Sequence, residues 1–105
     1  MTKQEALDKL SERGFSVNAY GNDSQGNTKT IYASTNPLEE FSYSCDVILE
    51  SEEFMFKYMA PESINVLQTP KCGSFLNDDH FNRLRKKFEP QARVLHDAFG
   101  KKETT

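Results

Sequence analysis

The sequence predicts an α+β fold, with a helix at each end and an antiparallel meander sheet of four or five strands between them. Two patterns predict it: apolar and polar residues alternate in the middle of the chain, and apolar residues recur at spacings of three and four near its end. The chain has 105 residues, of which 36% are hydrophobic, a size and composition typical of one domain. We expect that domain over residues 1–100 and a frayed tail at residues 101–105.

The first helix is predicted at residues 3–13 by the residues at its two ends. Thr2 and Glu5 have the capping-box spacing, in which each side chain accepts a hydrogen bond from the other residue's main chain. Gly14 suits the left-handed residue that often follows a helix. The apolar face of this helix consists of Ala6, Leu7 and Leu10.

The first two strands are predicted at residues 15–20 and 28–34. Residues 15–20 alternate, and the second segment is rich in β-branched residues, which favour strands. Gly, Asn and Asp dominate residues 21–27, which are therefore expected to form the connecting turn. The side chains expected to share one face of the first strand are Phe15, Val17 and Ala19.

The clearest alternation lies at residues 41–49, where every odd position is apolar or aromatic. A second aromatic strand follows at residues 54–59, so we expect a hairpin with residues 50–53 as its loop. This loop predicts pairs on one face, Leu49 with Phe54, Val47 with Phe56 and Cys45 with Tyr58, and pairs on the other, Asp46 with Lys57 and Ile48 with Met55.

The last elements are a short segment at residues 64–67 and a long helix at residues 78–99. The short segment suits a fifth strand or a single helical turn. Asn77 is a favourable N-cap for the helix, and Pro90 falls opposite its apolar stripe, which favours one kinked helix packed on the aromatic face over two abutting helices. The stripe consists of Phe81, Leu84, Phe88, Ala92, Leu95 and Phe99.

No motif in the sequence indicates a reaction, so we expect a protein that is not an enzyme, with no cofactor and no metal. Residues 21–28 lack the lysine of a phosphate-binding loop, and a strand follows them where that loop needs a helix. Cys72 has no recognisable base or orienting acid beside it. His80 and His96 are sixteen residues apart, on flanks of one helix that cannot share an ion.

The charges are segregated along the chain. Residues 38–62 contain seven acidic residues and one basic residue, whereas residues 80–102 contain seven basic residues and two acidic ones. Segregation of this kind bears on binding partners rather than on the fold.

Two binding functions follow from this segregation. The first is an adaptor or inhibitor that binds a larger protein with a basic surface. Its predicted contact residues combine an acidic rim with outward-facing apolar side chains: Glu39, Glu40, Ile48, Glu50, Glu52, Glu53, Met55 and Met59. The outward apolar side chains could equally be covered by this chain or by a second copy of it.

The alternative is a nucleic-acid-binding module that uses the basic face of the last helix, formed by Arg83, Lys86, Lys87 and Arg93. The order helix, strands, helix invites comparison with double-stranded-RNA-binding modules. Against this reading, the last helix starts with acidic residues and the isoelectric point is about 5.4.

The sequence also bears on where the protein acts. Its apolar runs are too short to span a membrane, and two cysteines are too few for a disulfide framework. We therefore expect a cytoplasmic protein without membrane contact. The composition is of the kind found in small phage-encoded proteins, which is an analogy only.

Overall fold

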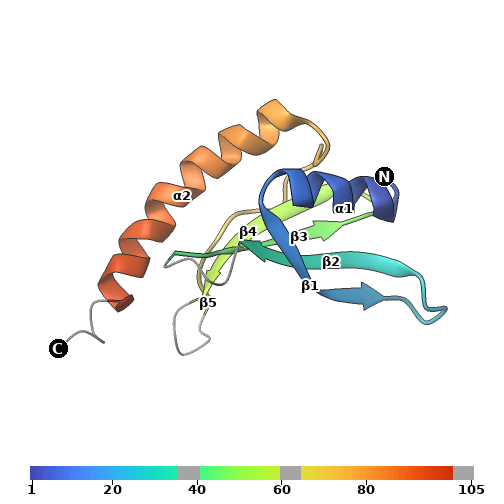
Figure 1. Cartoon of the computed structure of the whole chain (residues 1–105), viewed down its shortest axis with the longest axis horizontal. Helices are drawn as coiled ribbons and strands as arrows, with labels where there is room; N and C mark the ends of the chain where they lie inside the picture. Colours follow the sequence, from blue (N-terminus) through green and yellow to red (C-terminus); the bar gives the residue numbers. More distant parts are fainter. Residues whose placement is uncertain (36–40, 60–64, 101–105) are drawn as a thin grey trace.

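Two helices pack on one face of a five-stranded antiparallel sheet in the computed structural model, which describes residues 1–35, 41–59 and 65–100 (Figure 1). The strands lie in chain order, so the sheet is a meander and the predicted α+β fold is confirmed. The expected tail at residues 101–105 lies outside the described residues. The elements are α1 (Lys3–Glu12), β1 (Phe15–Asn22), β2 (Thr28–Thr35), β3 (Ser44–Ile48), β4 (Glu53–Met59), β5 (Asn65–Gln68) and α2 (Asp78–Gly100).

Helix α1 begins and ends as the sequence predicts. The Glu5 main-chain nitrogen donates to the Thr2 hydroxyl at 3.1 Å, and the Thr2 nitrogen donates to the Glu5 carboxylate at 2.8 Å. These two bonds satisfy main-chain groups that the first turn of a helix leaves unpaired. Gly14 follows with φ +87°, a left-handed conformation that glycine adopts without strain.

The first hairpin departs from the predicted side-chain pattern at a β-bulge. Val17 pairs with Ala33 but Ala19 pairs with Tyr32, so Asn18 is an extra residue in β1. The extra residue reverses the alternation, because two residues of the bulged strand oppose one residue of its partner. Ala19 therefore lies on the face opposite Phe15 and Val17, and its predicted position was wrong.

The central hairpin has the predicted faces but a register shifted by two residues. Val47 pairs with Phe54 and Cys45 with Phe56, so the predicted pairs were wrong, and the loop is residues 49–52 instead of 50–53. A shift of two residues keeps every side chain on its own face, so alternation cannot detect it. The main chain decides the register: the Leu49 nitrogen donates to the Lys29 carbonyl oxygen at 2.9 Å, which holds Leu49 beside β2.

Strand β3 is also shorter than the predicted 41–49 segment, although Phe41 and Tyr43 before it are buried as expected. The sequence at 64–67 suits a strand or a helical turn; of this region the structure describes residues from 65 onward, and Asn65–Gln68 form strand β5. The short edge strand β5 continues into a single bridge between Cys72 and Phe54, which holds the following segment beside β4.

Helix α2 is one continuous helix that contains Pro90, as predicted. Pro90 is exposed, so the Lys86 carbonyl oxygen that loses its helical hydrogen-bond donor lies on the solvent side, and the helix axis bends along its length (Figure 1). At the N-terminus, the His80 main-chain nitrogen donates to the Asn77 side-chain oxygen at 3.0 Å, which confirms the predicted N-cap. Phe81, Phe88 and Ala92 from the apolar stripe are buried against the sheet.

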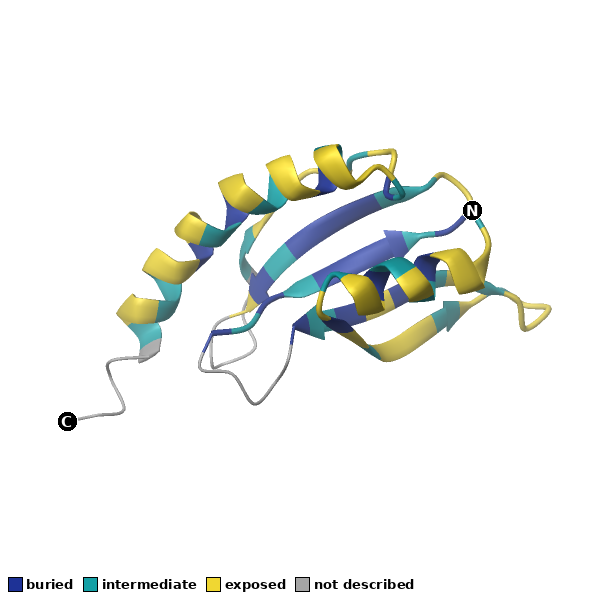
Figure 2. Ribbon diagram, turned by 45° about the horizontal axis from the view of Figure 1, so that its top comes forward, coloured by how far each residue is buried: buried dark blue, intermediate teal, exposed yellow. Residues whose placement is uncertain are grey.

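The core lies between the helices and the sheet face that they cover, called the inner face here (Figure 2). Its centre is Phe56, whose ring lies 5.2–6.3 Å, centroid to centroid, from five other aromatic rings. Edge-to-face and stacked pairs at this spacing add attraction beyond the burial of apolar area. The five rings belong to Phe15, Tyr43, Phe54, Phe81 and Phe88.

Helices α1 and α2 are joined to each other at their adjacent ends. An Arg13 nitrogen lies 2.7 Å, and the Lys9 nitrogen 3.1 Å, from the same Asp78 carboxylate oxygen. The Arg13 guanidinium also lies over the Phe81 ring, 4.0 Å from its centroid. This cluster fixes both helices on the inner face.

Candidate functional site

The face of the sheet opposite both helices, called the outer face here, carries most of the predicted contact residues that the structure describes. Because paired residues of antiparallel strands share a face, Tyr32, Asp46 and Met55 form one row across β2, β3 and β4. Thr30, Ile48 and Glu53 form the next row. Within the described residues neither helix covers this face (Figure 1).

The outer face combines apolar and polar groups. Tyr32 is 40% exposed and Met59 is 45% exposed, whereas Met55 is 9% exposed because its neighbours surround it. A hollow of about 250 Å³ lies on this face. Its walls are formed by Thr30, Tyr32, Asp46, Ile48, Phe54, Met55, Lys57 and Lys71.

One ion pair lies in the hollow. The Lys57 nitrogen is 2.7 Å from an Asp46 carboxylate oxygen, although the two residues are diagonal neighbours and not directly opposite. The sequence paired these two residues correctly by charge but in the wrong register. Asp46 is 8% exposed, so its negative charge is largely removed from solvent and needs this partner.

Lys71 supplies a second ammonium group to the same wall. It reaches the hollow because the Cys72–Phe54 bridge holds residues 69–72 beside β4. No local sequence pattern indicates this position, since the contact depends on a single bridge outside any regular strand pattern. The hollow therefore has two cations and one anion, whereas the sequence analysis expected an acidic surface here.

The three acidic residues of the central hairpin, Glu50, Glu52 and Glu53, are called the hairpin acids here. Glu50 lies 3.8 Å from the Lys29 ammonium, and Glu52 lies 3.5 Å from the amino group of Met1. Glu53 accepts a hydrogen bond from the Ser51 hydroxyl at 2.8 Å. Two of the three acids thus already have a cation nearby, and at these distances and exposures such pairs are weak.

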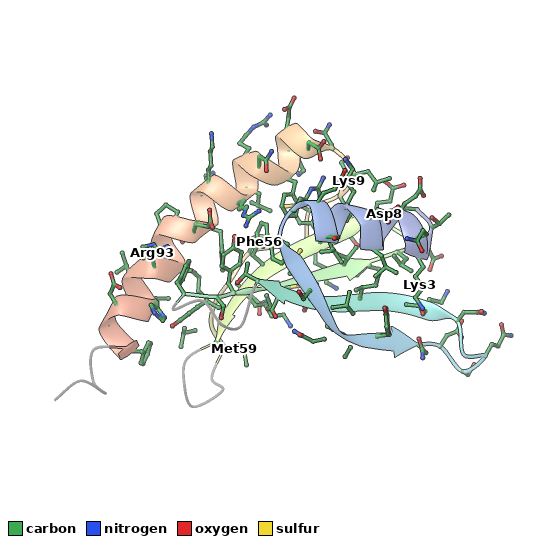
Figure 3. All side chains as sticks on the ribbon, viewed as in Figure 1. Lys3, Asp8, Lys9, Phe56, Met59 and Arg93 are labelled. Atoms are coloured by element: carbon green, nitrogen blue, oxygen red, sulfur yellow. The ribbon has the colours of Figure 1, made fainter. Side chains whose placement is uncertain are left out.

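The predicted contact residues are only partly gathered in one place. Ile48 and Glu53 are direct partners and Met55 is on the next row, so these three form one continuous surface. Met59 lies at the opposite end of β4, away from the hairpin loop (Figure 3). Glu39 and Glu40 lie outside the described residues.

The predicted basic face of α2 divides into two parts. Arg83, Lys86 and Lys87 are exposed, and no ion pair to them occurs within residues 1–35, 41–59 and 65–100. Arg93 instead places its guanidinium 4.5 Å from the centroid of the Phe41 ring. Arg93 is thus held against the core edge, apart from the other three.

A further arginine of α2 points toward the sheet and forms a partly buried network. The Arg85 side chain donates to the Tyr43 hydroxyl at 2.6 Å and to the Arg13 carbonyl oxygen at 2.9 Å. The Tyr43 hydroxyl donates to the Glu89 carboxylate at 2.8 Å. Burial, and next the Glu89 carboxylate, raise the pKa of Tyr43 well above its usual value, so the hydroxyl stays protonated. This network fastens α2 to the sheet.

The cysteines and histidines occupy separate places. Cys45 is fully buried, and burial raises the pKa of its thiol well above the usual range. His80 lies edge-on to the Phe54 ring, and the His96 ring nitrogen Nδ1 is 3.2 Å from the Tyr58 hydroxyl. In the part of the chain that the structure describes, no three His, Cys, Asp or Glu side chains come together as metal ligands would.

Comparison with protein-family models, curated proteins and solved structures finds no match to this chain. Among the described residues, neither helix combines the length and the apolar character needed to cross a membrane.

Proposed function

We propose that this protein is a non-enzymatic interaction module, an adaptor or inhibitor that binds a larger protein through the outer face of its sheet. The observation that carries the proposal is the hollow on that face, where apolar side chains lie beside the Asp46–Lys57 ion pair, while both described helices lie on the inner face. Apolar side chains around a hollow are a common feature of binding surfaces.

The charges around the hollow support a protein partner with a basic patch near the hairpin. Glu50 and Glu53 lie at one end of the outer face, and their ionic or hydrogen-bond partners are exposed side chains that a partner could displace. Complementary charge at such a rim raises the rate of association and fixes orientation. Two free cysteines suit a reducing compartment, and we propose a cytoplasmic setting.

The test is affinity capture from the native host with two outer-face variants, Ile48→Glu and Met59→Glu. We expect each to lose the captured protein, because a carboxylate placed in an apolar contact loses its hydration without gaining a partner. Val94→Glu is the matched control, since Val94 on α2 is 68% exposed and lies on neither proposed surface. Thermal melting of each variant shows whether it is folded.

A second candidate function is nucleic-acid binding through α2, favoured by the three exposed basic side chains Arg83, Lys86 and Lys87. Their spacing of three and four residues places them on one side of the helix, where they could contact successive phosphates. Titration with labelled oligonucleotides at about 50 mM salt tests this candidate, because phosphate contacts are strongest at low salt. Binding that is lost when the three residues are changed to Glu would favour it over the proposal above.

A further inference from the structure

Strand β1 forms one edge of the sheet, and one side of its main chain has no strand beside it within the described residues. It is eight residues long, whereas the opposite edge strand β5 has four. Figure 2 shows β1 as an exposed border of the sheet. An edge of this length presents a row of N–H and C=O groups to which another strand can add.

Strand β1 itself contributes no charged side chain to this edge. Residues 14–22 contain no Asp, Glu, Lys or Arg, in a chain of which 28% is charged. Charged side chains, prolines and bulges are the usual features that keep sheet edges apart. Of these, β1 has the bulge at Asn18, and the Asn18 side-chain nitrogen donates to the Ser34 hydroxyl at 3.0 Å, within its own sheet.

Aromatic side chains flank the edge on both faces. Tyr20 is 43% exposed and lies on the inner face, with the Lys3 ammonium 4.2 Å from its ring centroid (Figure 3). On the outer face, a Cβ at Gly21 would stand 3.4 Å from the Tyr32 ring. The glycine thus lets the Tyr32 ring lie across β1 toward the free edge.

We propose that β1 of one copy pairs antiparallel with β1 of a second copy, around a two-fold axis within Ala19–Asn22. In a two-fold pair each residue of β1 lies opposite residues of the identical strand in the second copy. Charged side chains on this edge would therefore face side chains of the same kind of charge and repel them. The uncharged edge avoids this repulsion, and main-chain hydrogen bonds with the tyrosines on either face provide the contact. The outer faces of the two copies would then form one continuous surface, independent of what binds there.

The test is the mass of the wild-type protein in solution, measured by sedimentation from low-micromolar to submillimolar concentration. We expect a monomer–dimer equilibrium, and Ala19→Lys should raise its dissociation constant at least about tenfold, because it places two ammonium groups across the axis. Val94→Lys adds the same charge to an exposed position on α2 and should leave the equilibrium unchanged.

Hydrogen exchange of the wild-type protein provides a second measurement that needs no variant. Amides of residues 19–22 that face the free edge should gain protection as the protein concentration rises, while amides of β5 should not. A protein that stays monomeric up to submillimolar concentration overturns the proposal. So does a dimer that Ala19→Lys leaves intact, or protection that rises at β5 instead.

Discussion

The two faces of the sheet differ in composition and in what covers them. The inner face consists of aromatic and aliphatic side chains that contact two helices, and Phe54, Phe56 and Val47 on it have no exposed area. The outer face consists of a tyrosine, methionines, an isoleucine, hydroxyl groups and the Asp46–Lys57 ion pair around a hollow. Both faces belong to the same strands, so the difference comes only from alternate residues.

If the outer face binds a partner as proposed, stability and binding depend on different residues. Burial of apolar area against the helices stabilises the fold, and the inner face supplies most of that area. Residues of the outer face contribute less to the fold and are therefore available for a partner. Three pairs of variants, from the largest expected effect to the smallest, can break or sharpen this separation, and a fourth measurement concerns the contact between the helices.

The largest effect is expected from a charge on the inner face. Val47→Asp places a carboxylate beside Phe54 with no partner, so the free energy of unfolding should fall by more than about 4 kcal/mol. Ser44→Asp on the outer face should change it by less than about 1 kcal/mol, because the new carboxylate stays partly exposed and the Lys57 that neutralises Asp46 lies directly opposite. Urea denaturation compares the two, and equal losses would show that the faces are wrongly assigned.

Neighbouring residues of β4 allow the same comparison without a charge. Phe56→Ala removes a ring in contact with five others and should cost about 3–5 kcal/mol. Met55→Ala enlarges a hollow that already opens to solvent, and should cost less than about 2 kcal/mol. A cost for Met55→Ala as large as that for Phe56→Ala would mean that the outer face is part of the core.

Two tyrosines compare the polar groups of the two faces. Tyr43→Phe removes a hydroxyl that joins Arg85 to Glu89, and should lower the free energy of unfolding by about 1–2 kcal/mol. Tyr32→Phe removes an exposed hydroxyl and should change it by less than about 0.5 kcal/mol. Thermal melts of both variants measure the difference, and a neutral Tyr43→Phe would contradict the proposed role of the network in holding α2.

The smallest effect concerns the pH dependence of the contact between the helices. Hydrogen bonds from Arg13, and next from Lys9, hold the pKa of Asp78 below its usual range. A lowered pKa in the folded state means that the ionised carboxylate stabilises the fold above its unfolded pKa. This contribution is lost as the pH falls through the folded pKa.

The carboxyl resonance of Asp78, followed by NMR, should therefore titrate at a lower pH than an ordinary aspartate. Asp78→Asn should remove the part of the pH dependence of the free energy of unfolding that this carboxylate contributes at acidic pH. A carboxyl that titrates at the ordinary pH or above it would mean that the contact with Arg13 does not persist in solution.

Alternation and helix periodicity predicted the element order and most of the inner face, because each depends on neighbours in the sequence. They could not predict the register of the central hairpin, since a shift of two residues preserves both faces. The bulge at Asn18 was missed for a related reason: one extra residue leaves no mark in composition but moves Ala19 to the other face.

The candidate site was predicted less completely than the fold. Ile48, Met55 and Glu53 were placed together because they belong to one hairpin, and the structure keeps them adjacent. Lys71 and the amino group beside Glu52 come from distant parts of the chain, so no local pattern reveals them. Arg85 lies four residues after Phe81 and three before Phe88, so helical spacing places it beside the apolar stripe, and this signal was missed because the residue is basic.

The proposal that the outer face binds a protein is tested most directly by one capture experiment on host extract, run with and without nuclease treatment. The baits are the wild-type protein, Ile48→Glu on the outer face, and a variant with Arg83, Lys86 and Lys87 changed to Glu. We predict that the wild-type and α2 variants retain the same protein and that Ile48→Glu, shown to be folded by its melting curve, loses it. Capture of the same partner by Ile48→Glu would contradict the proposal. Loss of the partner from the α2 variant, or on nuclease treatment, would contradict it as well.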